Sequence, residues 1–247
     1  MAAVPRIHVA TPLEPGMQLA LPPGAARHVQ VLRLQPGAAI TLFGGTANAG
    51  EYAATVLSMG RSEVIVRIVG HVAVERETRR LVHLALGVPA NERMDWMVEK
   101  ATELGVASVQ PLLTERTVVR LDAERARKRV AHWGSIAIAA CEQCGRNRVP
   151  LVQMPATLAS WLDVLEQPVD GHIRLVLSLL PHAADLREML HRGGFGATQV
   201  IVLLGPEGGL SGAEEARVLA GGFAPVSLGP RVLRAETAAL AALTLLG

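Results

Sequence analysis

The segment from Val200 to Gly247 constrains the fold of this chain most strongly, because short apolar runs alternate there with glycine-rich loops and helix signals. The β-branched run Val200–Leu204 stops at a glycine, as a buried parallel strand commonly does. Ser211, with Glu214 three residues later, forms a capping-box pattern and predicts the start of a helix. A second strand and a second helix are predicted at Pro225–Leu228 and Val232–Leu246. Strands that alternate with helices in this way favour an α/β fold with a parallel sheet.

Two loops rich in glycine directly follow these two strands. The first is Gly205–Gly209, with the sequence GPEGG, and the second is Gly229-Pro230. Glycines at the carboxyl ends of neighbouring parallel strands favour a small molecule that is bound by backbone atoms. Neither loop matches a dinucleotide fingerprint, and the pattern of a P-loop is absent. From spacing alone, two ordinary turns of an α/β domain are an equal alternative.

Residues 1–72 are rich in predicted strands, whereas strands and helices alternate from Leu81 onward. Short glycine turns separate the segments of the first part, which predicts a small barrel. Its strands are expected at Ala39–Phe43, Tyr52–Leu57 and Glu63–Val69, and the charged stretch Arg76–Arg80 suits a linker. In the second part, strands are predicted at Leu81–Val88, Val106–Pro111 and Ile173–Leu180. One predicted helix is capped by Asn91 and ended by Gly105, and another spans Glu124–Gly145. This order predicts a second domain with a mostly parallel sheet.

Composition narrows the class of protein further. Half of the residues are apolar, but no apolar stretch has the length of a membrane-spanning helix, and no signal-peptide pattern opens the chain, so we expect a cytoplasmic protein. Cys141 and Cys144 form a lone C-x-x-C without further ligands nearby, which favours packed, reduced thiols over a metal site. Only Lys100 and Lys128 are lysines, and arginine suits phosphate contacts and base stacking. A GC-rich genome would explain the arginine bias equally well.

Four segments, taken in order, resemble the motifs of the RsmE family within the SPOUT class of RNA methyltransferases. They are His28–Gly45, Met94–Leu112, Ile138–Pro150 and the C-terminal stretch that contains GPEGGLS and SLGPRVLRAETAAL. The resemblance implies a PUA-like, RNA-binding β-barrel over residues 1–72. It also implies a SPOUT methyltransferase domain over residues 75–247, in which the chain passes through a trefoil knot. Such knots are very rare, and the sequence pattern alone would not predict one.

The resemblance also implies S-adenosylmethionine as the cofactor, held by the two glycine loops and the start of the last helix. The implied binding residues are Leu204, Gly205, Glu207, Gly209, Leu228, Gly229, Leu233, Glu236, Thr237 and Ala238. Leu179 and Leu180, at the end of a predicted strand, are candidates for the same pocket, with plain core positions as the alternative. Glu207 either approaches the positive sulfonium or holds its loop through backbone N–H groups. Glu236 lies near a helix N-terminus, where the dipole favours an acid, so a purely structural role is its alternative.

The candidate catalytic residues are Arg146, Arg234 and Glu142. The helix dipole disfavours a cation at the start of a helix, so Arg234 is a candidate for contact with substrate or cofactor. Arg146 or Arg234 could stabilise negative charge on the uracil oxygens, and Glu142 is the candidate general base. A solvated helix end is the alternative interpretation of the polar stretch Glu142–Arg148. The candidate RNA contacts are Arg6, Arg33 and Arg148.

The activity implied by the resemblance is methylation of uridine N3 in the 16S ribosomal RNA of the small subunit. Two alternatives are a SPOUT enzyme that acts on another RNA and a non-catalytic RNA-binding factor of ribosome assembly. The resemblance further implies a homodimer. The predicted helix Ala235–Leu246 is apolar around most of its circumference, so a second subunit is a plausible partner for one of its faces. The stretch Glu142–Arg148 of one subunit would then face the cofactor loops of the other.

Overall fold

The chain divides into two compact units. The computed structural model describes residues 4–46, 49–61, 63–89, 93–119, 122–167, 169–191 and 196–247. The N-terminal unit comprises the residues up to Glu77 together with Ile138–Val149, and the C-terminal unit comprises Thr78–Ala137 and Pro150–Gly247. The sequence placed Ile138–Val149 in the second domain. The structure assigns this stretch to the N-terminal unit instead, because its side chains and backbone bond there, as described below.

The N-terminal unit is built on one five-stranded sheet with the order β1-β3-β4-β5-β2. Its strands are β1 (Arg6–His8), β2 (Gln18–Ala20), β3 (Ala39–Phe43), β4 (Glu51–Met59) and β5 (Val64–Val72). β1 pairs with β3 in parallel, and the other pairs are antiparallel. The predicted strands of this part are confirmed, with boundaries that shift by a few residues. Within the described residues the sheet is an open path that begins at β1 and ends at β2.

One helix of this unit was not expected from the sequence. The helix α1 (Pro23–Val31) has proline at its first position and buries Ala25, Ala26 and Val29. These three side chains join the core formed by the inward-facing residues of the strands. The apolar positions are few and small, so the helical periodicity is weak at the sequence level.

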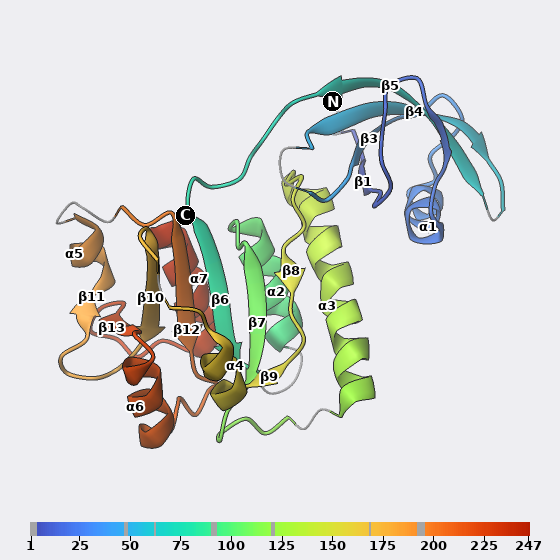
Figure 1. The fold of residues 1–247 in the computed structure, drawn as a ribbon. Helices are drawn as coiled ribbons and strands as arrows, with labels where there is room; N and C mark the ends of the chain where they lie inside the picture. The colour runs from blue at the N-terminus through green and yellow to red at the C-terminus, as the bar shows by residue number, and fades with distance from the viewer. Residues whose placement is uncertain are drawn as a thin grey trace. The chain divides into compact units, whose positions relative to one another are not determined.

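The C-terminal unit contains an eight-stranded sheet in which every pair is parallel (Figure 1). Its order is β11-β13-β10-β12-β6-β7-β8, and β9 also pairs with β7. The strands are β6 (Leu81–Gly87), β7 (Ser108–Leu113), β8 (Leu151–Val152), β9 (Ala156–Thr157), β10 (His172–Leu177), β11 (Ala184–Asp185), β12 (Gln199–Leu204) and β13 (Ala224–Ser227). The helices are α2 (Arg93–Glu103), α3 (Ala123–Cys144), α4 (Leu158–Val164), α5 (Leu186–His191), α6 (Gly212–Ala220) and α7 (Ala235–Leu246). The predicted α/β class and the mostly parallel sheet are confirmed. Asn91, the predicted cap of α2, lies outside the described residues.

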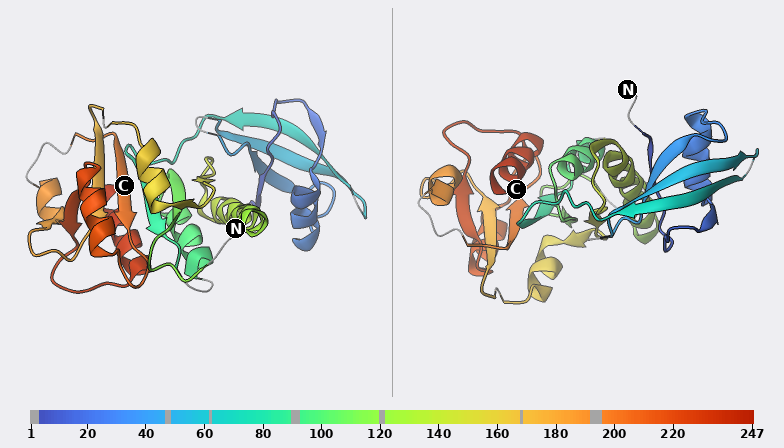
Figure 2. Two further views of the ribbon diagram at one scale, coloured as in Figure 1. Left: turned by 60° about the horizontal axis from the view of Figure 1, so that its bottom comes forward. Right: turned by 90° about the horizontal axis from the view of Figure 1, so that it is seen from above.

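Helices cover both faces of this sheet (Figure 2). On one face, Leu158 of α4 and Val218 of α6 pack in a cluster with Leu203 of β12. On the other face, α7 packs against α2, β6 and β12. Because neighbouring side chains of a strand point to opposite faces, a strand covered on both sides must be apolar throughout. This explains the uninterrupted run Val200–Leu204.

Three details near the carboxyl ends of the strands differ from the prediction. β12 and β13 are not neighbours, because β10 lies between them and pairs with both. β10 ends at Leu177 rather than Leu180, because the Ser178 hydroxyl accepts a hydrogen bond from Leu180 N at 3.1 Å and turns the chain. α7 begins at Ala235 rather than Val232, because Arg234 has an extended backbone at the N-cap, with ψ of 153°.

No helix in the described ranges combines the length and the apolar character that are needed to cross a membrane.

Candidate functional site

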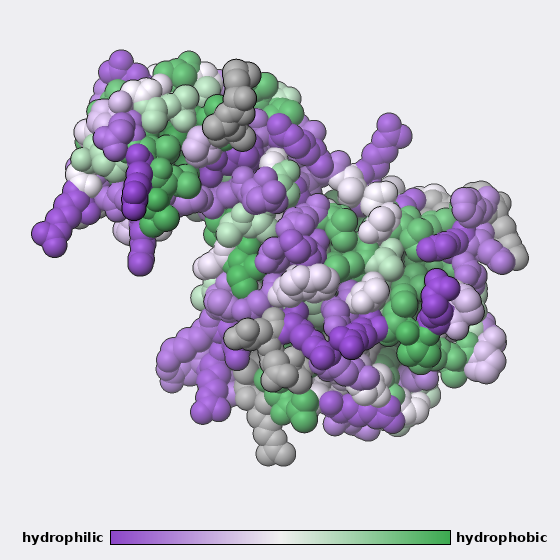
Figure 3. All heavy atoms as spheres, turned by 180° about the vertical axis from the view of Figure 1, so that it is seen from behind, coloured by the Kyte–Doolittle hydropathy of each residue, from purple (hydrophilic) through white to green (hydrophobic). Residues whose placement is uncertain are grey.

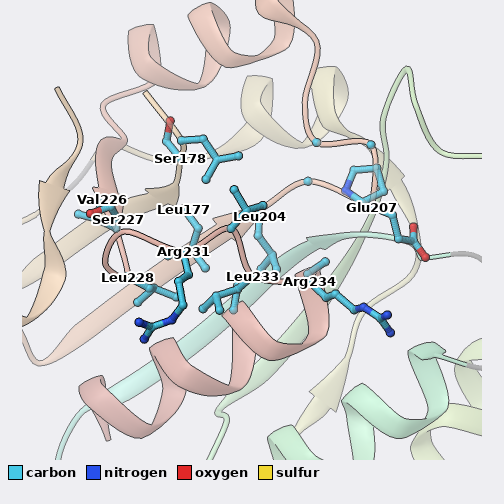
Figure 4. A pocket seen from close by; sticks show the side chains of 18 of the residues that line it. Leu177, Ser178, Leu204, Glu207, Val226, Ser227, Leu228, Arg231, Leu233 and Arg234 are labelled. Carbon is cyan, nitrogen blue, oxygen red and sulfur yellow. The ribbon is translucent and has the colours of Figure 1, made fainter. Parts of the chain in front are cut away.

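A cavity of about 550 Å³ opens at the carboxyl ends of β10, β12 and β13 (Figure 4). The chain reaches it through the ends of these strands and the loops that follow them. The lining residues are Arg93, Leu177–Leu179, Leu204–Gly209, Val226–Gly229, Arg231–Ala235 and Ala238. Parallel α/β sheets bind their ligands at this edge, at a point where the strand order changes direction. The volume lies within the range of ordinary ligand sites.

The first glycine loop approaches neighbouring backbone too closely for a side chain at Gly205. A Cβ atom at Gly205 would lie 2.7 Å from the carbonyl carbon of Gly209, and Gly209 itself has φ of +69°. A Cβ atom at Gly87, the last residue of β6, would lie 2.4 Å from Cδ of Pro206. Gly209 N donates to Pro206 O at 2.7 Å and closes the turn. These contacts fix the backbone of the loop against the ends of the sheet.

The interior of the cavity is apolar. Leu177, Leu204, Leu228 and Leu233 point toward one another, whereas Arg231 and Arg234 extend away from this group (Figure 4). Leucine side chains on several sides can enclose a flat aromatic ring, and the glycine loops leave backbone N–H and C=O groups accessible to ring edges. The arrangement therefore suits a ligand with an aromatic base and a polar tail.

Charged groups gather at the margin of the cavity. Arg93 Nη1 donates to Glu207 Oε1 at 3.2 Å and lies 3.9 Å from Glu236 Oε1. The other carboxylate oxygen of Glu236 is buried and has no hydrogen-bond partner among the described residues. Arg231 and Arg234 are exposed and form no ion pair within the described residues. At the margin, Glu207 and Glu236 thus share Arg93, whereas Arg231 and Arg234 remain accessible to a ligand.

The structure brings most of the predicted cofactor residues together. Those that line the cavity are Leu179, Leu204, Gly205, Glu207, Gly209, Leu228, Gly229, Leu233 and Ala238. Leu180, Glu236 and Thr237 do not line it. The side chain of Glu207 pairs with Arg93. The roles of all these residues in binding stay predictions.

Arg146 and Glu142 lie in the N-terminal unit and do not line the cavity. The Arg146 side chain is 4 % exposed and pairs with Glu77, whose Oε1 accepts from Arg146 Nε at 2.8 Å. Glu142 accepts from His8 N at 3.0 Å, and its second oxygen lies 3.0 Å from His28 Nδ1. Both residues therefore connect the end of α3 to the N-terminal sheet. Burial lowers the pKa of His8 and outweighs the opposing effect of Glu142.

The predicted RNA contacts differ in how far they are already engaged. Arg6 pairs with Glu51, donates to Asn147 Oδ1 at 2.7 Å and lies over the Phe43 ring at 4.9 Å from its centroid. Arg148 is half-buried beside the N-terminal sheet, where it forms an isolated bridge with Gly45. Arg33 is exposed, with φ of 52° directly after α1. Of the three, Arg33 is the side chain most open to a phosphate.

Cys141 is a buried thiol, whereas Cys144 is partly exposed. Burial raises the pKa of Cys141 to about 12, and its Sγ donates to Arg148 O at 3.4 Å. A thiol with a raised pKa is a poor metal ligand, because metals bind the thiolate. Within the described residues no group of three potential metal ligands is clustered.

Two arginines at the glycine loop were missed from the sequence. Arg93 opens α2 after β6, and Arg116 follows β7 and donates to the carbonyl oxygen of Gly208. β6 lies next to β12 in the sheet, and β7 lies on the other side of β6. The strand order was the missing information, because only that order brings these two chain segments to the same edge.

Comparison with known proteins gives a consistent result. Residues 76–247 match the model of the RNA methyltransferase domain family. The chain is 31 % identical to ribosomal RNA small subunit methyltransferase E of Bacillus subtilis over 201 residues, which cover 76 % of this chain and 73 % of that protein.

Two solved structures are similar over nearly the whole chain. A methyltransferase from Legionella pneumophila, in complex with bound SAM, has a TM-score of 0.90 and 38 % identity, with 99 % of this chain and 97 % of that chain covered. Ribosomal RNA small subunit methyltransferase E from Neisseria gonorrhoeae, bound to S-adenosyl methionine, has a TM-score of 0.86 and 34 % identity, with 98 % and 95 % covered. The fold, the cavity at the strand ends and these similarities agree, and this chain belongs to the ribosomal RNA small subunit methyltransferase E family of RNA methyltransferases.

Proposed function

We propose that this protein transfers a methyl group from S-adenosylmethionine to N3 of a uridine in 16S ribosomal RNA. Family membership and the S-adenosylmethionine complexes of two similar proteins support the activity and the cofactor. The observation that carries the proposal for this chain is the apolar cavity between two glycine loops at the carboxyl ends of β10, β12 and β13.

The cavity fits the chemistry of S-adenosylmethionine. The leucine group offers apolar faces to an adenine ring, and the backbone of Gly205–Gly209 and Leu228-Gly229 offers hydrogen bonds to polar edges. When bound, the cofactor supplies a methyl group on a positively charged sulfur. The surrounding leucines exclude water, which strengthens the electrostatic interactions of any charged group in the cavity.

Uridine N3 carries a proton, which would have to pass to solvent water before N3 could attack the methyl carbon and the sulfur could leave as S-adenosylhomocysteine. A cation beside the uracil oxygens would stabilise the resulting negative charge. We assign this role to Arg234, because its guanidinium is exposed at the cavity and forms no ion pair within the described residues. Arg146, by contrast, is already neutralised by Glu77, and both oxygens of Glu142 already have partners. We therefore assign these two residues to the architecture of the N-terminal unit.

The N-terminal unit is proposed to hold the RNA, in the manner of a PUA-like barrel. Its exposed Arg33 supports a phosphate contact there. Arg6 and Arg148 are already engaged in contacts within the unit, Arg6 with Asn147 and Arg148 with Gly45. For the C-terminal unit we propose the trefoil knot of the SPOUT class. The support is that the chain passes from β13, on one side of β10, to α7, which packs on β12 and β6 on the other side.

We also propose that the protein forms a homodimer through the C-terminal unit. Seen from behind, apolar surface gathers on this unit in the region of α7 (Figure 3). Leu240, Ala241 and Leu245 of this helix are only half-buried in the single chain. A second subunit would cover them.

Mass mapping of 16S ribosomal RNA tests the proposed function. RNA from a deletion strain should lack one 3-methyluridine, and purified protein with S-adenosylmethionine should restore it in isolated small subunits. Arg234→Ala should lower the rate at saturating cofactor by about 10²-fold or more. Arg187→Ala is the matched control, because Arg187 lies on α5, outside the cavity lining. If transfer RNA from the deletion strain lacked a methyl group instead, the proposal that 16S ribosomal RNA is the substrate would be wrong. If both RNAs were modified normally, the proposal that the protein is a methyltransferase would be wrong.

A further inference from the structure

The loop Gly205–Gly209 is held from outside at three successive residues. Pro206 packs against Gly87, Glu207 bonds to Arg93, and the carbonyl of Gly208 bonds to Arg116. All three partners belong to the carboxyl ends of β6 and β7 or to the segments that follow them. β6 pairs directly with β12, and β7 pairs with β6, so the sheet itself brings these segments to the loop.

We propose that Arg93 and Arg116 are positioning residues that hold the glycine loop in the shape that accepts the cofactor. The proposal rests on the proposed function, because it takes S-adenosylmethionine as the ligand of the loop. Neither arginine is needed for the chemistry of methyl transfer in this account. Arg116 acts through the backbone of the loop, and Arg93, which also lines the cavity, acts through the side chain of Glu207.

Arg116 holds the loop by packing as well as by hydrogen bonding. Its Nη1 donates to Gly208 O, and a Cβ atom at Gly208 would lie only 3.3 Å from its Cδ. The turn that carries Arg116 is itself anchored, because Glu115 N donates to Glu214 Oε1 at 2.8 Å. Glu214 in turn caps α6, the helix that follows the loop. The side chain of Arg116 therefore links the backbone of the glycine loop, at Gly208, to a turn that is itself bonded to α6.

Arg93 holds the loop by charge. Its guanidinium lies between Glu207 and Glu236, whose side chains are 33 % and 13 % exposed. Within the described residues it is the only cation within 4 Å of Glu236. Loss of Arg93 would leave two carboxylates close together, one of them largely buried. Their repulsion would move Glu207, and the loop with it, because the helix fixes Glu236.

Calorimetric titration of the full-length protein with S-adenosylhomocysteine tests the proposal. Arg93→Gln and Arg116→Gln should each raise the Kd by about tenfold, the effect expected when a charge-assisted hydrogen bond that organises a site is lost. For Arg116→Gln, whose residue does not line the cavity, the affinity for RNA should not change, and kcat at saturating S-adenosylmethionine should stay within about threefold of the wild type. A merely structural role would lower the melting temperature without this split between cofactor binding and turnover.

The matched control is Arg217→Gln. Arg217 lies in the same unit, pairs with Asp163 at 2.6 Å and is 48 % exposed, but it does not line the cavity. Its variant should bind S-adenosylhomocysteine like the wild type. Arg93→Lys should retain most of the affinity, because it restores the charge beside Glu207.

A double variant distinguishes an effect of carboxylate repulsion on cofactor affinity from a general loss of folding. Glu207→Gln in the Arg93→Gln background removes one of the two repelling carboxylates, so it should recover part of the affinity. Wild-type affinity in both single arginine variants would overturn the proposal, as would no recovery in the double variant. If the wild-type protein itself bound no S-adenosylhomocysteine, the proposed function would fail instead, and the two failures are thus distinguishable.

Discussion

At the scale of single residues, the cavity depends on where side chains are absent as much as on where they are present. Gly205 sits against the backbone of Gly209, and Gly87 sits against Pro206. Neither position has a positive φ, so the need for glycine arises from close approach rather than from backbone conformation. Gly209 is different, because its φ of +69° disfavours other residues even though little lies nearby.

We predict that Gly205→Ala lowers the affinity for S-adenosylmethionine by at least about tenfold, because the loop must move away from the new Cβ atom. Isothermal titration calorimetry measures the effect. Gly212→Ala is the control, because a Cβ atom there meets nothing within 4 Å and the residue opens α6. Equal affinity in the two variants would mean that the ligand does not use this loop.

The acid Glu51 makes the N-terminal unit sensitive to pH. Burial alone would raise the pKa of Glu51, but hydrogen bonds from Arg76 and Arg6 outweigh burial and lower it from its ordinary value of 4.5. A carboxyl group with a lowered pKa in the folded state stabilises that state above the unfolded value and loses this contribution as the pH falls below it.

We therefore predict that Glu51→Gln lowers the melting temperature at pH 7 and that its difference from the wild type shrinks below pH about 4.5, the ordinary range of a carboxyl group. Differential scanning calorimetry of both proteins from pH 7 to pH 4 measures this. Glu63→Gln, at an exposed position that precedes β5, should show no such dependence. A constant difference across this range would show that the charge of Glu51 is irrelevant to stability.

At the scale of elements, α6 connects the glycine loop to the rest of the C-terminal unit. Ser211 Oγ accepts from Glu214 N at 3.2 Å, and Glu214 Oε2 accepts from Ser211 N at 2.9 Å. The capping box that the sequence predicts is thus confirmed. Only the structure shows that Glu214 also accepts from Glu115 N, on the turn after β7.

We predict that Ser211→Ala destabilises the C-terminal unit by about 1 kcal/mol, the usual cost of losing an N-cap side chain. Glu214→Ala should cost more, because it removes the bond to Glu115 N as well. Urea unfolding followed by tryptophan fluorescence measures both, since Trp96, Trp133 and Trp161 all lie in this unit. A smaller loss for Glu214→Ala than for Ser211→Ala would contradict the double role of this acid.

At the scale of the whole molecule, the two units have different sources of stability. The N-terminal unit combines a small apolar core with a network of Arg6, Glu51, Arg76, Glu77 and Arg146. The C-terminal unit relies on a parallel sheet covered on both faces. The last residues of α3 belong to the first unit, so a fragment that begins near Glu75 would lose the partners of Glu142 and Asn147.

We predict a homodimer at working concentration, because the half-buried leucines of α7 favour a second subunit. Static light scattering coupled to size exclusion should give twice the chain mass of 26.1 kDa. A mass of one chain across the accessible concentrations would rule out the dimer and any active site shared between subunits.

Local sequence patterns are sufficient to predict the α/β class, most strands, the capping box and the two glycine loops. These features are local, because apolar periodicity, turn residues and helix caps act over a few neighbouring residues. The resemblance of the four motifs added the family and its cofactor, which no periodicity could supply.

Contacts between distant residues could not be predicted from these local patterns and are known from the three-dimensional structure. It placed β10 between β12 and β13, brought Arg93 and Arg116 to the glycine loop, and paired Arg146 with Glu77. The physical reason is that each of these contacts joins segments far apart in the chain, and their meeting depends on strand order. That order minimises the free energy of the whole unit, and no short window of sequence encodes it.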